Sequence, residues 1–183
     1  HCPSFSRPFS ALYNETANFL SNMSPDLANA LSSLPHGPEF RFVDELTALQ
    51  PGQSAAGRYH LPEDAAFLAG HFPARPLMPG VLMIEALAQV AGIAAQTHPE
   101  VPPLGDLRLT AIRAVKILGT IAPGETLHLE AEISGRLGPL VQASGRVTTE
   151  KGVVLLEGQV TLSGILTEPP PPVSPHNPSA AAD

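Results

Sequence analysis

The sequence predicts an α+β fold in which one long central helix is wrapped by a curved antiparallel sheet of about six strands. Two observations lead to this fold class. One apolar segment, residues 78–95, has the length of a core helix and carries a single carboxylate, Glu85. After that segment the hydrophobic period changes from 3.6 to 2, and short turns join the later strands. A sheet that packs its concave face on the helix satisfies both observations.

Two strands and a short helix are expected before the long helix. The segment 24–34 predicts the short helix, because Ser24 can cap it, Pro25 suits its first position and leucines recur along one side. Residues 39–49 and 54–61 predict the two strands, divided by the turn QPGQ. The long helix itself is expected to begin near residue 78.

The strands after the long helix follow from alternation and turn residues. Residues 107–117 predict the first of them. The segment TLHLEAEI, residues 126–133, alternates cleanly, with its apolar residues on one face and His128 on the other, toward solvent. Turns at LGP and EKG then separate two further strands, PLVQASGRVTT and VVLLEGQVTL.

Composition divides the chain into three regions. Residues 1–24, rich in Ser, Asn and aromatics, are expected to be an N-terminal extension or a remnant of cloning. Residues 25–166 carry the regular patterns and are expected to form one domain, since a chain of 183 residues suits one core. Residues 167–183 are proline-rich and are expected to be a disordered tail, with binding of a proline-motif partner as the alternative.

Charge and hydropathy argue against several classes of partner. The formal net charge is −7 and no run of Lys and Arg is present, so nucleic acid is not expected as a partner. Pro79 and Gly80 interrupt the start of the apolar segment, which favours a buried helix over membrane insertion. The lone Cys2 and the lack of a visible secretory signal favour a reducing compartment, so we expect a cytoplasmic protein.

The predicted long helix carries one carboxylate, Glu85, among apolar residues, and its presence there needs an explanation. Glu85, Ala88, Gln89 and Gly92 share one helix face by i, i+3, i+4 and i+7 spacing. This polar or small face can line a narrow channel while the apolar faces pack on the sheet. A lone buried carboxylate costs several kcal/mol unless it is paired, hydrogen-bonded or protonated. The alternative is an exposed Glu85 paired with an arginine, which the apolar neighbours disfavour.

The loop before the helix adds a base and an oxyanion donor. His71 lies in GHFPARPLMPG, where three prolines restrict φ and hold the imidazole in a rigid setting, as a general base requires. A histidine considered alone is more often structural. Gly80 lets a ligand approach the first-turn N–H groups, which can polarise a carbonyl oxygen. Together these groups suit removal of a proton beside a carbonyl and loss of a β-hydroxyl as water.

The segment GHFPARPLMPGVLMIEALAQ, residues 70–89, closely resembles the signature of the bacterial 3-hydroxyacyl-[acyl-carrier-protein] dehydratases of the hot-dog fold. The likeness extends to LPHGPEFRFVDEL before it and APGETLHLEAEI after it. It implies homodimers whose sheets join edge to edge, and active sites where the histidine of one subunit faces the glutamate of the other. Further assembly into a trimer of dimers stays open.

The resemblance also assigns roles within the motif. It makes His71 the base that takes the α-proton of a 3-hydroxyacyl thioester and Glu85 the acid that helps the β-hydroxyl to leave. The N–H groups of Gly80 and Val81 hold the thioester oxygen. The supporting residues are Gln89, Phe72 and Pro79. No metal or redox cofactor is expected, because the other histidines lack metal-ligand spacing and no glycine-rich phosphate loop is present. The resemblance implies that the substrate is carried on the phosphopantetheine of an acyl carrier protein or on coenzyme A.

Some positions depart from the family pattern. His36 begins the segment HGPE, where family members often have histidine–arginine–tyrosine–proline, and Leu107 begins LRL where aromatic residues are common. Acyl-chain length is therefore open. Glu85 stands where the isomerase branch usually has aspartate, which favours plain dehydration. The cations available to dock an acidic carrier are Arg75, Arg108, Arg113 and Lys116, with ordinary solvated charges as the alternative.

Two other functions remain as alternatives at this point. An acyl thioesterase would direct water at the carbonyl carbon, and the paired histidine and glutamate of the motif do not favour that chemistry. A non-catalytic partner subunit that binds acyl chains is disfavoured because both His71 and Glu85 are present.

Overall fold

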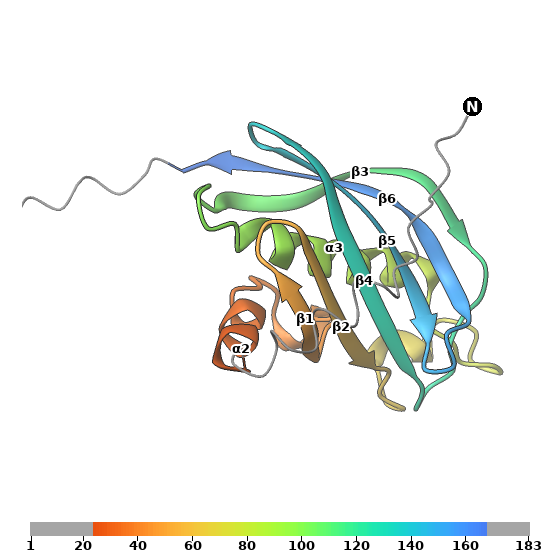
Figure 1. Cartoon of the computed structure of the whole chain (residues 1–183). Coiled ribbons are helices and arrows are strands. Elements are labelled where there is room, and N and C mark those ends of the chain that lie inside the picture. Colours follow the sequence, from red (N-terminus) through yellow and green to blue (C-terminus); the bar gives the residue numbers. More distant parts are fainter. Residues whose placement is uncertain (1–23, 168–183) are drawn as a thin grey trace, which may run out of the picture.

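The computed structural model describes residues 24–167 of the 183-residue chain. The expected N-terminal extension and the proline-rich tail lie outside these residues, apart from Ser24 and Thr167. The described residues confirm the predicted α+β fold: one six-stranded antiparallel sheet, in the order β1-β2-β4-β5-β6-β3, curves around a central helix (Figure 1). The proposed division into an extension, one domain and a tail stays a prediction.

The elements follow the expected order along the chain. The strands are β1 (Glu45–Gln50), β2 (Ser54–His60), β3 (Leu104–Ile117), β4 (Thr126–Leu137), β5 (Leu140–Thr149) and β6 (Val154–Leu166). The helices are α2 (Ser24–Ser32) and α3 (Gly80–Gln96), and two short 3-10 turns are η2 (Pro38–Phe40) and η3 (Ala66–Ala69). In Figure 1, α3 lies behind the sheet and α2 lies beside β1.

The long helix α3 forms the centre of the core. From Met83 to Ala95 every residue except Glu85 is buried. Burial of these side chains against the sheet stabilises the fold, by about 25 cal/mol for each Å² of apolar surface. The helix begins at Gly80 rather than near residue 78, because Pro79 has an extended backbone (φ −58°, ψ 133°) and disfavours a helical conformation in the residue before it. No helix among the described residues has the length and apolar character needed to cross a membrane.

Strand β4 shows the predicted alternation. Leu127, Leu129 and Ala131 point at α3 and are at most 1% exposed. His128 lies on the outer face as expected, yet it is only partly exposed, because Arg58 of β2 and Thr148 of β5 pair beside it. The alternation therefore predicted the face correctly but not the burial, which depends on the neighbouring strands.

The predicted strand at residues 39–49 is only half right. Residues Pro38–Phe40 form η2, and regular pairing begins at Glu45. Pro38 suits the first position of a helical turn. The side chain of Gln89 binds the Phe40 carbonyl and the Phe42 N–H, so these backbone groups have no need of a neighbouring strand. A side chain distant in sequence thus replaces strand pairing in the first half of the segment where local propensity predicts a strand.

Candidate active site

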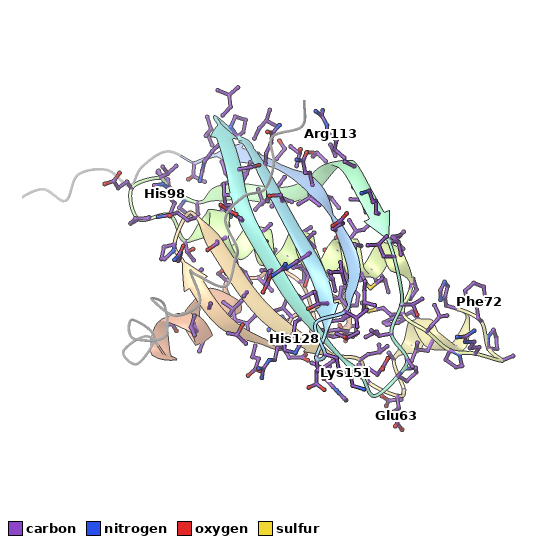
Figure 2. All side chains as sticks on the ribbon, turned by 45° about the vertical axis from the view of Figure 1, so that its right-hand side comes forward. Glu63, Phe72, His98, Arg113, His128 and Lys151 are labelled. Atoms are coloured by element: carbon purple, nitrogen blue, oxygen red, sulfur yellow. The ribbon has the colours of Figure 1, made fainter. Side chains whose placement is uncertain are left out.

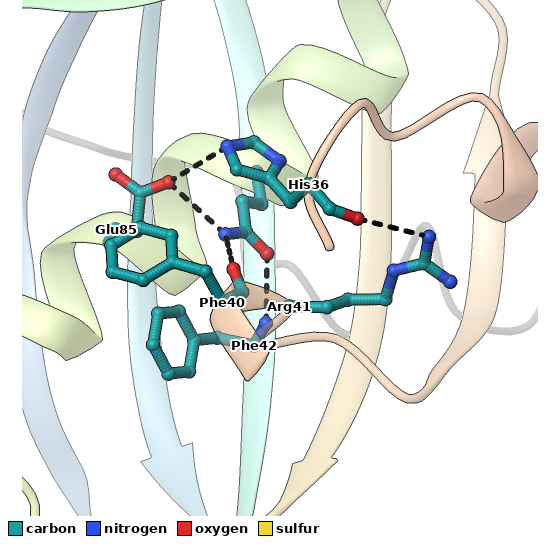
Figure 3. A network of polar contacts seen from close by, with 6 residues as sticks. His36, Phe40, Arg41, Phe42 and Glu85 are labelled. Atoms are coloured by element: carbon teal, nitrogen blue, oxygen red, sulfur yellow. Dashed lines mark hydrogen bonds and ion pairs between the residues drawn. The ribbon is translucent and has the colours of Figure 1, made fainter. Parts of the chain in front are cut away.

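Glu85 lies in the second turn of α3 and is held through one of its oxygens. Its Oε1 accepts a hydrogen bond from Gln89 Nε2 at 3.1 Å and lies 3.4 Å from His36 Nε2 (Figure 3). The side chain of Glu85 is 20% exposed, so this carboxyl is neither fully buried nor free in solvent. The alternative of an arginine partner is excluded within the described residues, because the partners of Glu85 there are an amide and an imidazole.

Gln89 links Glu85 to the segment that follows α2. It is 2% exposed, and its position one turn after Glu85 puts the two side chains on one face of α3. Its Oε1 accepts the Phe42 N–H at 2.9 Å, and its Nε2 donates to the Phe40 carbonyl at 2.9 Å and to Glu85. Every polar atom of the amide is thus satisfied, as burial requires.

His36 belongs to the same network, although sequence reasoning treated it only as part of a divergent segment. Its ring lies 6.2 Å from that of Phe40, and its carbonyl accepts a 3.4 Å hydrogen bond from Arg41 Nη2. The signal that could have found it is the one used for His71, since prolines flank His36 in PHGP.

Aromatic side chains hold this segment against the core. Phe42 packs edge-on against Phe40 at 5.0 Å and against Tyr59 at 5.6 Å. Burial raises the pKa of Tyr59 to about 12, with a smaller contribution from the Asp44 carboxylate. The phenol is therefore neutral across the working range of an enzyme and acts here as a packing surface.

A cavity of about 530 Å³ opens beside Glu85 and follows α3. Glu85, Ala88, Gln89 and Gly92 all line it, together with Gln96 further along the helix. This confirms the prediction that the polar and small face of the helix borders a channel. The opposite wall comes from the start of β3, with Leu107 and Leu109, and from Leu162 of β6.

His71 lies in the loop before α3 and is partly buried. Its Nδ1 is 3.0 Å from the Leu77 carbonyl, and because a carbonyl only accepts, Nδ1 carries the proton of the neutral ring. Nε2 is then left with a lone pair, the state that a general base needs. The ring also contacts that of Phe72 at a centroid distance of 4.3 Å.

Phe72 has a left-handed backbone with φ of 60°, which is uncommon for a bulky residue. Its side chain is 59% exposed and projects away from the sheet in Figure 2. The cost of this conformation is tolerated where the surrounding loop determines it, and such residues concentrate at functional sites.

The structure does not bring His71 and Glu85 of one chain into contact. Among the described residues, the polar partners of the Glu85 side chain are Gln89 and His36, and that of the His71 ring is the Leu77 carbonyl. His71 is also absent from the lining of the cavity beside Glu85. His71 and Glu85 therefore lie in separate places on the same chain.

The start of α3 meets the requirements of an oxyanion site. Within the described residues the N–H groups of Gly80 and Val81 make no hydrogen bond, as expected in the first turn of a helix. Val81 is 66% exposed. A Cβ on Gly80 would lie 2.6 Å from Ile117 Cδ1, so glycine allows β3 to approach the helix start closely. Pro79 precedes both donors and directs the chain into the helix.

The four cations considered for carrier docking are exposed but differ in their pairing. Arg108 is 3.2 Å from Asp106, and Lys116 is 3.1 Å from Glu157. Arg75 and Arg113 have no ion pair within the described part of the chain. Of these four, Arg75 and Arg113 therefore offer uncompensated charge to an acidic partner. Across residues 24–167, no cluster of three metal-binding side chains occurs.

The model of the FabA-like domain matches residues 34–161. Three curated relatives are described as 3-hydroxyacyl-[acyl-carrier-protein] dehydratase FabZ. The one from Roseiflexus castenholzii is 36% identical over 142 residues, which cover 77% of this chain and 93% of the relative. The relative from Acetivibrio thermocellus is 38% identical, and the match covers 73% of this chain and 90% of the relative. The relative from Bacillus subtilis is 36% identical, and the match covers 73% of this chain and 89% of the relative.

Solved structures share the fold at low sequence identity. A chain of the dehydratase heterocomplex ApeI:P from Xenorhabdus doucetiae has a TM-score of 0.63 at 16% identity, covering 75% of this chain and 90% of that one. Zebrafish thioesterase superfamily member 2 has a TM-score of 0.55 at 14% identity, covering 74% of this chain and 91% of that one. At these identities the likeness shows the fold alone.

Proposed function

Because the chain belongs to the FabA-like domain family, we propose that it converts a 3-hydroxyacyl thioester to the trans-2-enoyl thioester in fatty-acid biosynthesis, with hydration as the reverse reaction. The observation that carries this proposal is Glu85, held by Gln89 at a cavity that follows α3. A partly desolvated carboxyl beside such a cavity is suited to donate a proton to the hydroxyl group on the third carbon of a bound acyl chain.

The proposed reaction needs two proton transfers. His71 Nε2 takes the α-proton of the thioester, and the electron pair of that C–H bond becomes the Cα–Cβ double bond. Glu85 gives its proton to the β-hydroxyl, the C–O bond breaks and water leaves. The N–H groups of Gly80 and Val81 stabilise negative charge on the thioester oxygen. Side chains and backbone supply every group in these steps, so the proposal calls for no cofactor.

We propose that the site is shared between two copies of the chain, with His71 of one facing Glu85 of the other. Two observations support this. His71 and Glu85 lie apart within one chain. Strand β3 has a neighbour, β6, on one side only, and Ile112 and Ile117 on it are 52% and 50% exposed. A long edge strand with apolar side chains is a surface that proteins normally cover.

The acyl chain is proposed to lie along α3, from Glu85 past Gly92 toward Gln96. This stretch of helix is about 16 Å long, given a rise of about 1.5 Å per residue. At its far end Gln96 binds both the N–H and the carbonyl of Leu104, which ties the start of β3 to the helix. The cavity wall there is thus held by two hydrogen bonds.

Gly92 is expected to set the acyl length that this channel accepts. A Cβ at Gly92 would lie 3.6 Å from Leu107 Cδ2 and 3.8 Å from Leu162 Cδ1, which are ordinary contacts. Gly92→Ala should therefore fold and raise the free energy of unfolding by up to about 1 kcal/mol, because alanine favours helix. Gly92→Leu should fill the channel and lower kcat/KM for long enoyl thioesters about tenfold or more, with little change for crotonyl thioesters. An equal loss for both lengths would contradict this route for the acyl chain.

The carrier is proposed to be an acyl carrier protein, and the protein to work in the cytoplasm where that carrier is used. The exposed Arg75 and Arg113 are candidates to meet the acidic carrier, since Arg108 and Lys116 already pair with carboxylates. Coenzyme A thioesters remain the alternative substrates, and the test below separates the two carriers.

The test of the function is hydration of crotonyl coenzyme A and of a crotonyl carrier protein, followed by loss of the enoyl-thioester absorbance. Hydration of either substrate supports the dehydratase, and the ratio of the two rates identifies the carrier. Release of free thiol without hydration would instead establish an acyl thioesterase, a reaction that the fold also accommodates. Neither reaction, with short or long enoyl chains, would leave a non-catalytic acyl-binding subunit.

A further inference from the structure

We propose that His36 is a positioning residue that determines which oxygen of Glu85 carries the proton given to the substrate. This inference rests on the proposed dehydration. It concerns a residue outside the motif that joins His71 to Glu85, and it follows from the contacts that converge on Glu85 in Figure 3.

The orientation of the Gln89 amide is fixed by the backbone around it. The Phe42 N–H can only donate, so the atom it meets at 2.9 Å is the amide oxygen. The other end of the amide is therefore the nitrogen, which also donates to the Phe40 carbonyl at 2.9 Å. Gln89 Nε2 must then act as a donor toward Glu85 Oε1, and Oε1 is an acceptor.

His36 places its Nε2 3.4 Å from this same oxygen. Because Oε1 is an acceptor, a lone pair on Nε2 would face the lone pairs of that oxygen. The proton of the imidazole is therefore on Nε2. Oε2 of Glu85 has no partner among the described residues and is directed away from His36 (Figure 3). In the protonated acid, Oε1 is then the carbonyl oxygen and Oε2 carries the proton, toward the open site.

The surroundings of His36 hold the ring in this role. Its Nδ1 is buried without a hydrogen-bond partner in the described residues. A proton on Nδ1 would have no acceptor there, so the proton of the ring is placed on Nε2. Packing on Phe40 and the hydrogen bond from Arg41 to the His36 carbonyl keep the ring and its backbone in place. The other charged groups bordering the cavity are Asp106 and Arg108, which pair with each other.

Loss of the His36 donor should change kcat rather than KM. Without it, Glu85 has one fixed partner instead of two, and its proton is divided between Oε1 and Oε2. Substrate binding should be retained, because Gln89 and the cavity wall remain. We expect His36→Leu to lower kcat for hydration about tenfold, at an unchanged KM.

The experiment compares His36→Leu with His36→Gln, using crotonyl thioesters. The amide nitrogen of glutamine is the same number of bonds from Cα as Nε2 of histidine, so His36→Gln keeps a neutral donor near Oε1. We expect His36→Gln to recover most of the lost kcat. His60→Leu is the matched control, since His60 is exposed on β2 and its ring contacts Thr126. It should leave kcat unchanged, and circular dichroism and Tm should show that all variants are folded.

Four other results would overturn the inference. Equal loss of kcat in His36→Leu and His36→Gln would show that the ring itself is needed for packing. A higher KM with unchanged kcat would make His36 a substrate-binding residue. Normal turnover in His36→Leu, with Glu85→Gln inactive, would leave the proposed function intact and remove His36 from it. Failure of the unsubstituted protein to hydrate any enoyl thioester would instead remove the proposed function, and this inference with it.

Discussion

His71→Ala and Glu85→Gln are each expected to reduce hydration and dehydration by about 10²–10⁴-fold, the usual contribution of a general acid or base. His71 Nε2 holds the lone pair that takes the α-proton, because Nδ1 faces the Leu77 carbonyl. Alanine removes that lone pair. Glutamine at position 85 keeps the size of the side chain and its neighbours but has no carboxyl proton to give. The measurement is the steady-state rate with enoyl and 3-hydroxyacyl thioesters.

Matched controls separate chemistry from folding in this experiment. His60→Ala removes an exposed histidine of β2, and Glu132→Gln removes an exposed carboxylate of β4, so both should retain turnover. Tm and the size of the assembly should be unchanged in all four variants. Near-normal turnover in His71→Ala or in Glu85→Gln would remove that residue from the proposed mechanism, while leaving the role of the other to be judged separately.

Activity is expected to return when the two inactive chains are combined in one dimer. In a mixed dimer of His71→Ala and Glu85→Gln chains, one site receives both substitutions and the other receives neither. The mixed dimer should therefore show roughly half of the unsubstituted activity, as the two-fold symmetry of such a dimer requires. Two affinity tags, one on each chain, allow the mixed dimer to be purified from co-expressed material and assayed.

The same experiment distinguishes a shared site from one within a single chain. If His71 and Glu85 of the same chain formed the site, both sites of the mixed dimer would carry a substitution and stay as inactive as the parents. That result would refute the shared site, although the roles of the two residues would stand. A dimer of two His71→Ala chains is the control, because it should remain inactive whichever arrangement holds.

Local pattern was enough to predict the helix, its channel face and most of the strands. Helical spacing alone puts Glu85, Ala88, Gln89 and Gly92 on one face, and all four line the cavity. Alternation alone turns Leu127 and Leu129 of β4 toward α3. These features depend on the geometry of a single helix or strand, which residues adjacent in the sequence determine. They can therefore be predicted from the sequence.

Two other features depend on residues that meet only in the folded chain. The strand predicted at residues 39–49 is shortened because the buried amide of Gln89 binds the backbone of Phe40 and Phe42. His36 reaches Glu85 only because the segment after α2 folds back along α3. By itself the sequence determined which side chains share a face of α3. Tertiary structure alone decided which oxygen of Glu85 is held and which is left open, because hydrogen bonds between distant segments form only after the core has packed.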